Sequence, residues 1–236
     1  MDVIIVNLLG VQKLLIGPPV KWGALVIGGF IFVLPALIWF DVVHKNGLAK
    51  AETGNKVTFV LFKNRMLKIV LTGPESTGKT TLAKHLAGHY RTAWAPEFAR
   101  SYLNGLGRPY ERADLLKIAE GQLALEDEIA ATANDLLFLD TSLEVIKIWS
   151  EFRYGNCDPW ILEKLKTRPS DLYLLCKPDL PWELDPQREN PKDREALYDI
   201  YRQELMALNV PFSEIQGFDE YRFYQCVSAI ETSQKK

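Results

Sequence analysis

A glycine-rich segment carries the clearest chemistry in the sequence. Residues 73–80 are Gly-Pro-Glu-Ser-Thr-Gly-Lys-Thr, which fits the pattern G-x-x-x-x-G-K-[ST] without a mismatch. Gly73 and Gly78 let the backbone curl so that its N–H groups point inward, where they can bind a phosphate. Lys79 can then reach the β- and γ-phosphates of ATP, and the Thr80 hydroxyl can ligate Mg²⁺. The segment therefore predicts a phosphate-binding loop, or P-loop, with ATP and Mg²⁺ as cofactors. The residues expected to bind the nucleotide are Gly73, Glu75, Ser76, Thr77, Gly78, Lys79, Thr80 and Thr81.

An acid at the end of an apolar run is the second candidate for the site. Asp140 ends the run Leu136–Asp140 (LLFLD), which is typical of a buried parallel strand. In P-loop proteins such an acid lies beside Mg²⁺, so we expect Asp140 to be a metal-site and catalytic residue. The alternative is that Asp140 only caps the helix that follows.

Glu97 and Arg100 lie three residues apart in the segment Arg91–Arg100 (RTAWAPEFAR), which predicts a short strand and then a helix. Residues at this spacing share one face of a helix. Glu97 could accept the proton of an attacking hydroxyl, and Arg100 could hold substrate or phosphate. An ordinary ion pair on the surface explains the spacing equally well. The sequence does not rank Glu97 and Asp140 as the catalytic base.

The segment 178–194 (PDLPWELDPQRENPKDR) is rich in proline and charge and predicts a loop. A lid over ATP requires a loop whose arginines can neutralise the transferring phosphate. Arg188, as a catalytic residue, and Arg194, as a nucleotide-binding residue, are the candidates. An exposed loop with solvated charges is the alternative.

Apolar runs and amphipathic segments alternate from Leu67 to the C-terminus, which predicts a parallel sheet with helices on both faces. The expected strands are 67–71, 136–140, 171–176 and 210–215. Helices are expected after residue 78, over 194–208 and from about residue 220. The fold class is therefore α/β, namely the three-layer fold of P-loop NTPases, within which an AAA-like ATPase domain is one form.

The motifs GPESTGKTTL, APEFAR, LLFLDT, KIWSEF and DLYLLCKPDLPWELDPQR occur in one order between Met66 and the C-terminus. Together they resemble the ribosylnicotinamide kinase domain of the NadR family. The resemblance implies transfer of the γ-phosphate of ATP to the 5′-hydroxyl of nicotinamide riboside, which yields nicotinamide mononucleotide in NAD biosynthesis. It implies substrate-side roles for Glu97, Arg100 and Asp140. It also implies a lid around Asp185, Arg188 and Arg194, with Asp185 on the substrate side.

The same resemblance makes aromatic residues candidates for stacking on the pyridinium ring, with packing in the core as the alternative for each. They are Trp94, Trp149, Phe152 and Tyr154, of which Trp149 is the one expected to bind substrate. Ser142 departs from the family, which often has a second acid at this position. The DNA-binding segment and adenylyltransferase domain of the family's regulators do not fit into residues 1–65.

Residues Trp22–Phe40 carry no charged side chain, and tryptophans lie near both ends of the run. As a helix the run would be about 28 Å long, close to the thickness of a bilayer core, so a transmembrane helix is predicted over about 22–40. More lysines and arginines follow the run than precede it, which places the following part in the cytoplasm, anchored to the inner face of the membrane. A signal peptide, a buried helix and a mis-called gene start before Met66 are the alternatives. The predicted organisation is an extension of 1–65 and a kinase domain of 66–236.

Composition sets further limits on the partners. The formal net charge of −2, without a massed basic patch, argues against nucleic acid as a partner. The three cysteines form no C-x-x-C pair, which argues against a zinc site or a disulfide framework. The oligomeric state is not indicated. Two other functions remain open: another P-loop nucleoside kinase, and a nucleotide-binding ATPase or switch without a small-molecule acceptor.

Overall fold

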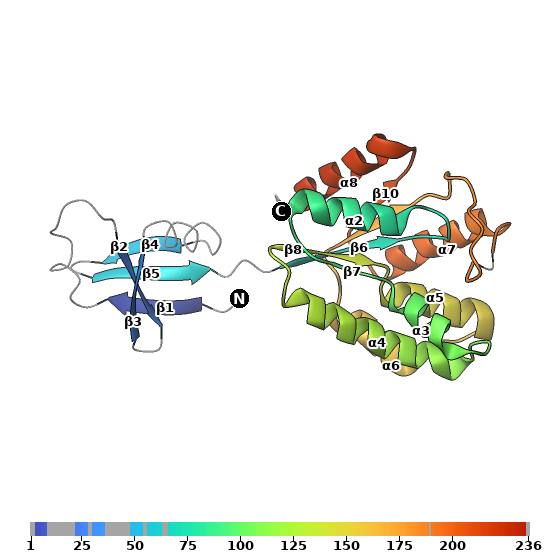
Figure 1. The fold of residues 1–236 in the computed structure, drawn as a ribbon, viewed down its shortest axis with the longest axis horizontal. Helices are drawn as coiled ribbons and strands as arrows, with labels where there is room; N and C mark the ends of the chain where they lie inside the picture. The colour runs from blue at the N-terminus through green and yellow to red at the C-terminus, as the bar shows by residue number, and fades with distance from the viewer. Residues whose placement is uncertain are drawn as a thin grey trace. The chain divides into compact units, whose positions relative to one another are not determined.

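A computed structural model describes residues 3–8, 22–27, 30–35, 48–53, 56–62, 66–188 and 190–234. The chain divides into two compact units, Met1–Arg65 and Met66–Lys236 (Figure 1). Each unit is described by itself below, and only secondary structure is described for the first.

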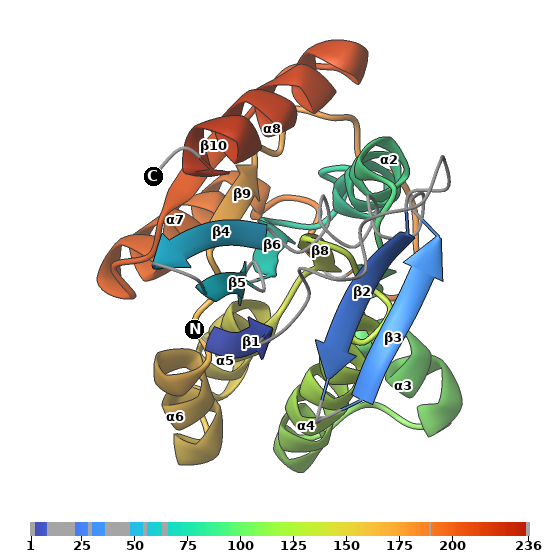
Figure 2. The same cartoon turned by 90° about the vertical axis from the view of Figure 1, so that its left-hand side faces the viewer.

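The first unit contains β-strands in the residues that the structure describes. Strands β1 (Val3–Leu8), β5 (Lys56–Phe62) and β4 (Leu48–Thr53) form an antiparallel sheet in the order β1-β5-β4. A second antiparallel pair consists of β2 (Trp22–Ile27) and β3 (Phe30–Pro35), which Figure 2 shows side by side.

The transmembrane helix predicted over about 22–40 is wrong for the described part of that run. Trp22 pairs with Pro35 and Ile27 pairs with Phe30, so the run doubles back on itself. Valine, isoleucine, phenylalanine and tryptophan favour strands, which explains why this run forms two strands. Residues 28–29 and 36–40 lie outside the described residues. Within the part of the chain that the structure describes, no helix has the length and hydropathy needed to cross a membrane.

The second unit is built on a five-stranded parallel sheet, as predicted, in the order β10-β9-β6-β8-β7. The strands are β6 (Leu67–Thr72), β7 (Trp94–Ala95), β8 (Leu136–Asp140), β9 (Leu172–Cys176) and β10 (Phe212–Ile215). Every residue of β8 and β9 is buried, as expected for central parallel strands covered on both faces.

Helices cover both faces of this sheet (Figure 1). They are α2 (Lys79–Tyr90), α3 (Phe98–Leu106), α4 (Arg112–Ala130), α5 (Leu143–Tyr154), α6 (Pro159–Thr167), α7 (Arg194–Ala207) and α8 (Asp219–Gln234). Alternate side chains of β6 point to opposite faces: Ile69 and Leu71 pack with α2 and α8, whereas Val70 packs with α5 and α7. The result is a three-layer α/β unit.

A third apolar cluster lies among α3, α4, α5 and α6. Ala99 of α3, Ile118 of α4, Ile146 of α5 and Ile161 of α6 are all buried in it. The strand before α3, β7, has only two residues and therefore anchors α3 weakly. Side-chain packing in this cluster holds α3 against the rest of the unit. It thereby positions the first turn of α3, where Glu97 and Arg100 lie.

Because the strands are parallel, the carboxyl ends of β6, β7 and β8 lie next to one another on the same side of the sheet. The segments that follow these ends are Gly73–Gly78, Pro96–Glu97 and Thr141–Ser142. Ligands of open α/β sheets bind at these ends, and the candidate residues from the sequence converge there.

Candidate phosphotransfer site

The glycine-rich loop connects β6 directly to α2. Gly73 has a φ of +126°, and a Cβ atom there would lie 2.6 Å from the carbonyl oxygen of Cys176 in β9. Glycine is therefore required at this position both for the backbone conformation and for the contact with β9. Gly78 also has a positive φ, of +76°, and directly precedes the first residue of α2. The loop thus presents the N-terminus of α2 to the pocket, which favours an anion.

Lys79 extends back over the loop. Its Nζ donates hydrogen bonds to the carbonyl oxygens of Gly73 (2.9 Å) and Pro74 (2.6 Å), and lies 3.4 Å from the Thr77 hydroxyl. The Thr77 hydroxyl itself donates to Pro74 O at 2.9 Å. These partners are all uncharged, so they hold the ammonium in place and leave its positive charge available to a phosphate.

The end of β8 meets the start of α2 at the Thr80 and Asp140 side chains. The Thr80 hydroxyl donates to Asp140 Oδ2 at 2.5 Å, and Asp140 is only 2% exposed. Burial raises the pKa of Asp140, while the Thr80 hydrogen bond and the charge of Lys79 act in the opposite direction. A hydroxyl and one carboxylate are hard oxygen donors of the kind that Mg²⁺ uses together with phosphate oxygens and water. Among the described residues, no cluster of three His, Cys, Asp or Glu side chains suited to a metal occurs.

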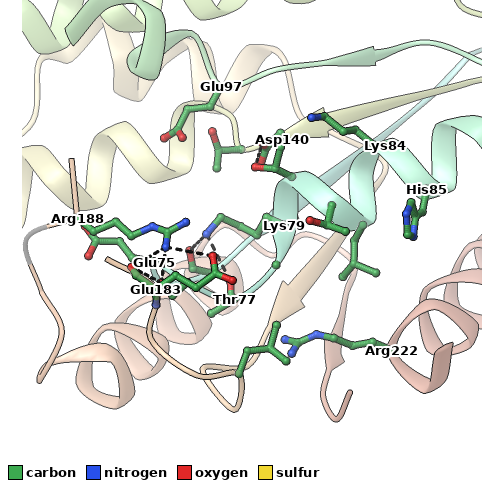
Figure 3. A pocket seen from close by; sticks show the side chains of 18 of the residues that line it. Glu75, Thr77, Lys79, Lys84, His85, Glu97, Asp140, Glu183, Arg188 and Arg222 are labelled. Atoms are coloured by element: carbon green, nitrogen blue, oxygen red, sulfur yellow. Dashed lines mark hydrogen bonds and ion pairs between the residues drawn. The ribbon is translucent and has the colours of Figure 1, made fainter. Parts of the chain in front are cut away.

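Glu97 lies at the N-terminus of α3 and lines the same pocket (Figure 3). Burial raises the pKa of its carboxyl most, and the nearby charge of Asp140 raises it further; Lys79 and Arg100 lower it. The backbone N–H of Phe98 donates to Gln122 Oε1 at 2.9 Å, which fixes the start of α3 on α4. The sequence-predicted acids Glu97 and Asp140 are therefore brought together beside Lys79.

Arg100 pairs with a residue far away in the sequence. Its Nη1 lies 2.8 Å from Asp185 Oδ2, whereas the described residues show no ion pair between Arg100 and Glu97. The backbone N–H of Gln187 and the Arg100 side chain lower the pKa of Asp185. The predicted substrate-side residues Arg100 and Asp185 are therefore joined to each other, and Arg100, but not Asp185, lines the pocket.

The two arginines of the expected lid differ in their environment. Arg188 lines the pocket and donates to the Ser76 hydroxyl at 2.7 Å. Arg194 does not line it: its guanidinium donates to the carbonyl oxygens of Ser76 (3.2 Å) and Leu180 (2.9 and 3.0 Å) and lies over the Trp182 ring. Arg194 thus ties the segment before α7 to the P-loop through backbone oxygens.

The pocket has a volume of about 960 Å³ and extends to both sides of the P-loop. One end lies by α3, α5 and α7 and includes Leu103, Val145, Trp149 and Tyr201. Trp149 is therefore in the pocket, with its ring stacked on Tyr110 at a centroid distance of 6.4 Å. The other aromatic candidates do not line it: Trp94 packs against the core under Lys84, Phe152 is exposed, and Tyr154 packs in the α3–α6 cluster.

Two parts of the pocket were not predicted. Tyr201 of α7 is 4% exposed, lines the pocket, and makes no hydrogen bond through its hydroxyl to any described residue. At the opposite end, α2 and α8 contribute His85, Arg222, Phe223 and Tyr224. The sequence predicts helices at these places but contains no motif there, because these residues reach the pocket only through tertiary packing.

The model of a protein family described as AAA domain matches residues 68–221 of this chain. The chain belongs to this family. The AAA domain includes the P-loop, Glu97, Asp140 and the segment up to the start of α8, so the predicted P-loop domain of AAA-like type is confirmed.

The predicted resemblance to NadR proteins is also confirmed. Across 170 residues the chain is 28% identical to the trifunctional NAD biosynthesis/regulator protein NadR of Salmonella typhimurium, which covers 69% of this chain and 42% of that protein. The NadR of Escherichia coli K12 is 27% identical over 169 residues, covering 69% and 41%. The chain thus spans about two fifths of the length of these curated relatives.

Solved structures show the same fold. The crystal structure of NadR protein in complex with NR matches with a TM-score of 0.60 at 20% identity, covering 72% of this chain and 52% of that one. The crystal structure of NadR protein in complex with NAD and AMP-PNP matches with a TM-score of 0.58 at 18% identity, covering 72% and 50%. A thymidylate kinase from Ehrlichia chaffeensis matches with a TM-score of 0.50 at 12% identity, covering 70% and 99%. The AAA domain of this chain therefore has the P-loop kinase fold.

Proposed function

We propose that this chain is a ribosylnicotinamide kinase, which transfers the γ-phosphate of ATP to the 5′-hydroxyl of nicotinamide riboside. The observation that carries the proposal is one continuous pocket that is lined by the P-loop cation Lys79 and by the acids Glu97 and Asp140 (Figure 3). Its volume of about 960 Å³ lies near the top of the usual range for ligand pockets, roughly 300–1,000 Å³, so there is room for a nucleotide and a second ligand. The NadR relatives support nicotinamide riboside as that second ligand.

In this proposal the P-loop end of the pocket binds the triphosphate. The inward N–H groups of the loop and the N-terminus of α2 bind the phosphates, and Lys79 offsets the charge that develops on the moving phosphoryl group. Thr80 and Asp140 would hold Mg²⁺, which when bound neutralises charge on the β- and γ-phosphates.

Glu97 is the proposed base. Asp140 is already engaged by the Thr80 hydroxyl at 2.5 Å, whereas the Glu97 carboxyl accepts no hydrogen bond from the described residues. A carboxyl whose pKa is raised by burial is a stronger base once ionised, so it can take the proton of the attacking 5′-hydroxyl. Arg100 would orient the acceptor, and its ion pair with Asp185 would hold the arginine in place.

The Trp149 end of the pocket is the proposed place for the pyridinium ring. An indole face attracts a cation, and the stacked Tyr110 ring supports the indole from a neighbouring segment. Since the reaction consumes ATP, the proposal places the enzyme in the cytoplasm.

The test is a substrate panel with the full-length protein, ATP and Mg²⁺. Nicotinamide riboside, thymidine, uridine and deoxyadenosine are compared by ADP release and by mass of the phosphorylated product. We expect nicotinamide riboside to have the highest kcat/KM. If it is no better than thymidine or uridine, the acceptor is wrong and another nucleoside is the substrate. If ATP hydrolysis proceeds unchanged with every nucleoside, the chain is an ATPase or switch instead of a kinase.

A further inference from the structure

The Ser76 hydroxyl is the point at which the P-loop meets the segment before α7. Its Oγ accepts hydrogen bonds from Arg188 Nη1 at 2.7 Å and from the Glu183 backbone N–H at 3.2 Å. The Ser76 carbonyl oxygen accepts from Arg194 at 3.2 Å. One P-loop residue therefore contacts three residues that lie more than one hundred positions later in the chain.

The backbone of Ser76 is in a conformation that disfavours a side chain. Its φ is +54°, in the left-handed region where glycine has no steric penalty, and the residue is only 8% exposed. A strained non-glycine residue at a ligand site persists only when the surrounding structure over-determines it. For Ser76 the contacts with Arg188, Glu183 and Arg194 contribute to this.

The closest partners of Arg188 are uncharged oxygens, and two carboxylates lie at longer ion-pair distances. Its close hydrogen bonds go to neutral oxygens, the Ser76 hydroxyl and the Glu183 carbonyl at 2.8 Å. The Glu183 and Asp185 carboxylates are farther away, at 3.6 and 3.8 Å. Figure 3 shows the Arg188 guanidinium and the Lys79 ammonium pointing toward the same part of the pocket. Two cations directed toward one part of the pocket form a site suited to a multiply charged anion.

The segment before α7, which carries Arg188, also forms hydrogen bonds with α3. Asp185 pairs with Arg100 at 2.8 Å, and Gln187 Nε2 donates to Asn104 Oδ1 at 2.7 Å and to the Arg100 carbonyl at 3.2 Å. Arg188 is thus held between the P-loop on one side and α3 on the other, and Ser76 is the contact on the phosphate side.

We propose that Ser76 is a positioning residue, whose hydroxyl holds the Arg188 guanidinium at the γ-phosphate end of the bound nucleotide. This role is separate from phosphate binding by the backbone of the loop. The effect of this positioning on catalysis rests on the proposed kinase function, whereas its effect on the affinity for the nucleotide does not.

The experiment compares Ser76→Ala and Ser76→Gly in the full-length protein. Both remove the hydroxyl, whereas only glycine also relieves the backbone conformation. Ser101→Ala is the matched control, because Ser101 lies on the exposed face of α3 and donates only to Phe98 O. We measure Kd for a non-hydrolysable ATP analogue and for ADP by calorimetry.

Loss of a hydrogen bond to a charged group should weaken binding of the triphosphate about tenfold in both Ser76 variants. ADP lacks the γ-phosphate, so its Kd should change much less. Arg188→Ala should have the same selective effect, and adding Ser76→Ala to it should weaken binding no further, because the two residues act as one unit.

The proposal is overturned if the two Ser76 variants bind the analogue like wild type, if ADP binding weakens equally, or if the effects of Ser76→Ala and Arg188→Ala add. If Ser76→Ala does not fold, Ser76→Gly and its pair with Arg188→Ala provide the same comparison. These measurements need no acceptor. A protein that shows the coupling but does not phosphorylate nicotinamide riboside would therefore refute the proposed function alone.

Discussion

The Thr80 hydroxyl lies 2.5 Å from Asp140 Oδ2, which joins the first turn of α2 to the end of β8. The two residues are sixty positions apart in the chain. Their contact places a hard oxygen pair beside the glycine-rich loop, and Asp140 is almost completely buried.

Replacement of Asp140 by asparagine tests whether this pair serves a metal. Asparagine preserves the shape and can still accept the Thr80 hydrogen bond, but it removes the negative charge. Because Mg²⁺ binding to a nucleotide complex relies on one or two carboxylates, we expect kcat to fall at least about a hundredfold and the Mg²⁺ requirement to rise. Initial rates over a series of Mg²⁺ concentrations measure both.

Asp127→Asn is the matched control for this change. Asp127 forms an exposed ion pair with Arg168 outside the pocket, and such pairs contribute little. Its activity and Mg²⁺ response should equal those of wild type. An Asp140→Asn enzyme with the wild-type Mg²⁺ response would show that Asp140 is not a metal ligand.

The raised pKa of Glu97 predicts a pH dependence for the reaction. A base acts only when ionised, so kcat/KM should rise with pH through the pKa of Glu97, at a higher pH than an ordinary glutamate would give. Glu97→Gln removes the base, and we expect a loss of about 10²- to 10⁴-fold and no rise over that range. Glu120→Gln, an exposed change on α4, should keep the wild-type profile. A Glu97→Gln enzyme with a normal profile would leave Asp140 as the base.

The Tyr201 hydroxyl predicts a contact with the acceptor. It belongs to a side chain that is 4% exposed and lines the pocket, and it has no hydrogen bond with the described residues. Burial raises its pKa well above the ordinary value, so it stays a neutral donor at every working pH. Tyr201→Phe should raise KM for the acceptor about fivefold, the effect of one lost hydrogen bond, and leave KM for ATP unchanged.

Tyr198→Phe on the same helix is the control for Tyr201. The Tyr198 hydroxyl donates to Glu214 at 2.8 Å, and Tyr198 does not line the pocket. Its loss should lower the stability of the protein slightly without changing KM for the acceptor. Equal KM values for Tyr201→Phe and wild type would show that the hydroxyl does not contact the acceptor.

Local sequence patterns predicted the strands and helices of the second unit well, because these elements depend mainly on residues that are close together in the chain. The bounds of β8 were predicted at the residues found, and the helix expected after residue 78 is α2, which begins at Lys79. The P-loop was evident because its chemistry lies within eight residues. Arg100–Asp185 was not predictable as a pair, since only packing of α3 brings residues 85 positions apart into contact.

The error over residues 22–35 has a related cause. An uncharged run meets the length criterion of a transmembrane helix, but length and hydropathy do not distinguish one long helix from two short strands. The strand-favouring side chains and the Gly28–Gly29 pair were the contrary signal, and the pairing of Ile27 with Phe30 follows them.

Glu144 predicts a pH dependence of stability that is independent of the reaction. The residue is 0% exposed at the start of α5, where its carboxyl lies beside the Thr72 side chain. Burial raises the pKa of Glu144 to about 7, whereas the nearby backbone N–H groups and the Thr72 hydroxyl lower it; the charge of Glu126 adds a smaller increase. Because the folded pKa exceeds the unfolded value, the free energy of unfolding should fall as pH rises from the unfolded pKa to about 7 and then level off.

Glu144→Gln removes the charge and should abolish this part of the pH dependence. The shift corresponds to about 3 kcal/mol, so the variant should exceed wild type in unfolding free energy by up to that amount at pH 8, and match it within about 1 kcal/mol near pH 4.5. Urea denaturation at both pH values measures the difference, with the exposed Glu120→Gln as the matched control. If the Glu144→Gln and wild-type curves differ equally at the two pH values, the pKa of Glu144 is not raised in the folded protein and the prediction is wrong.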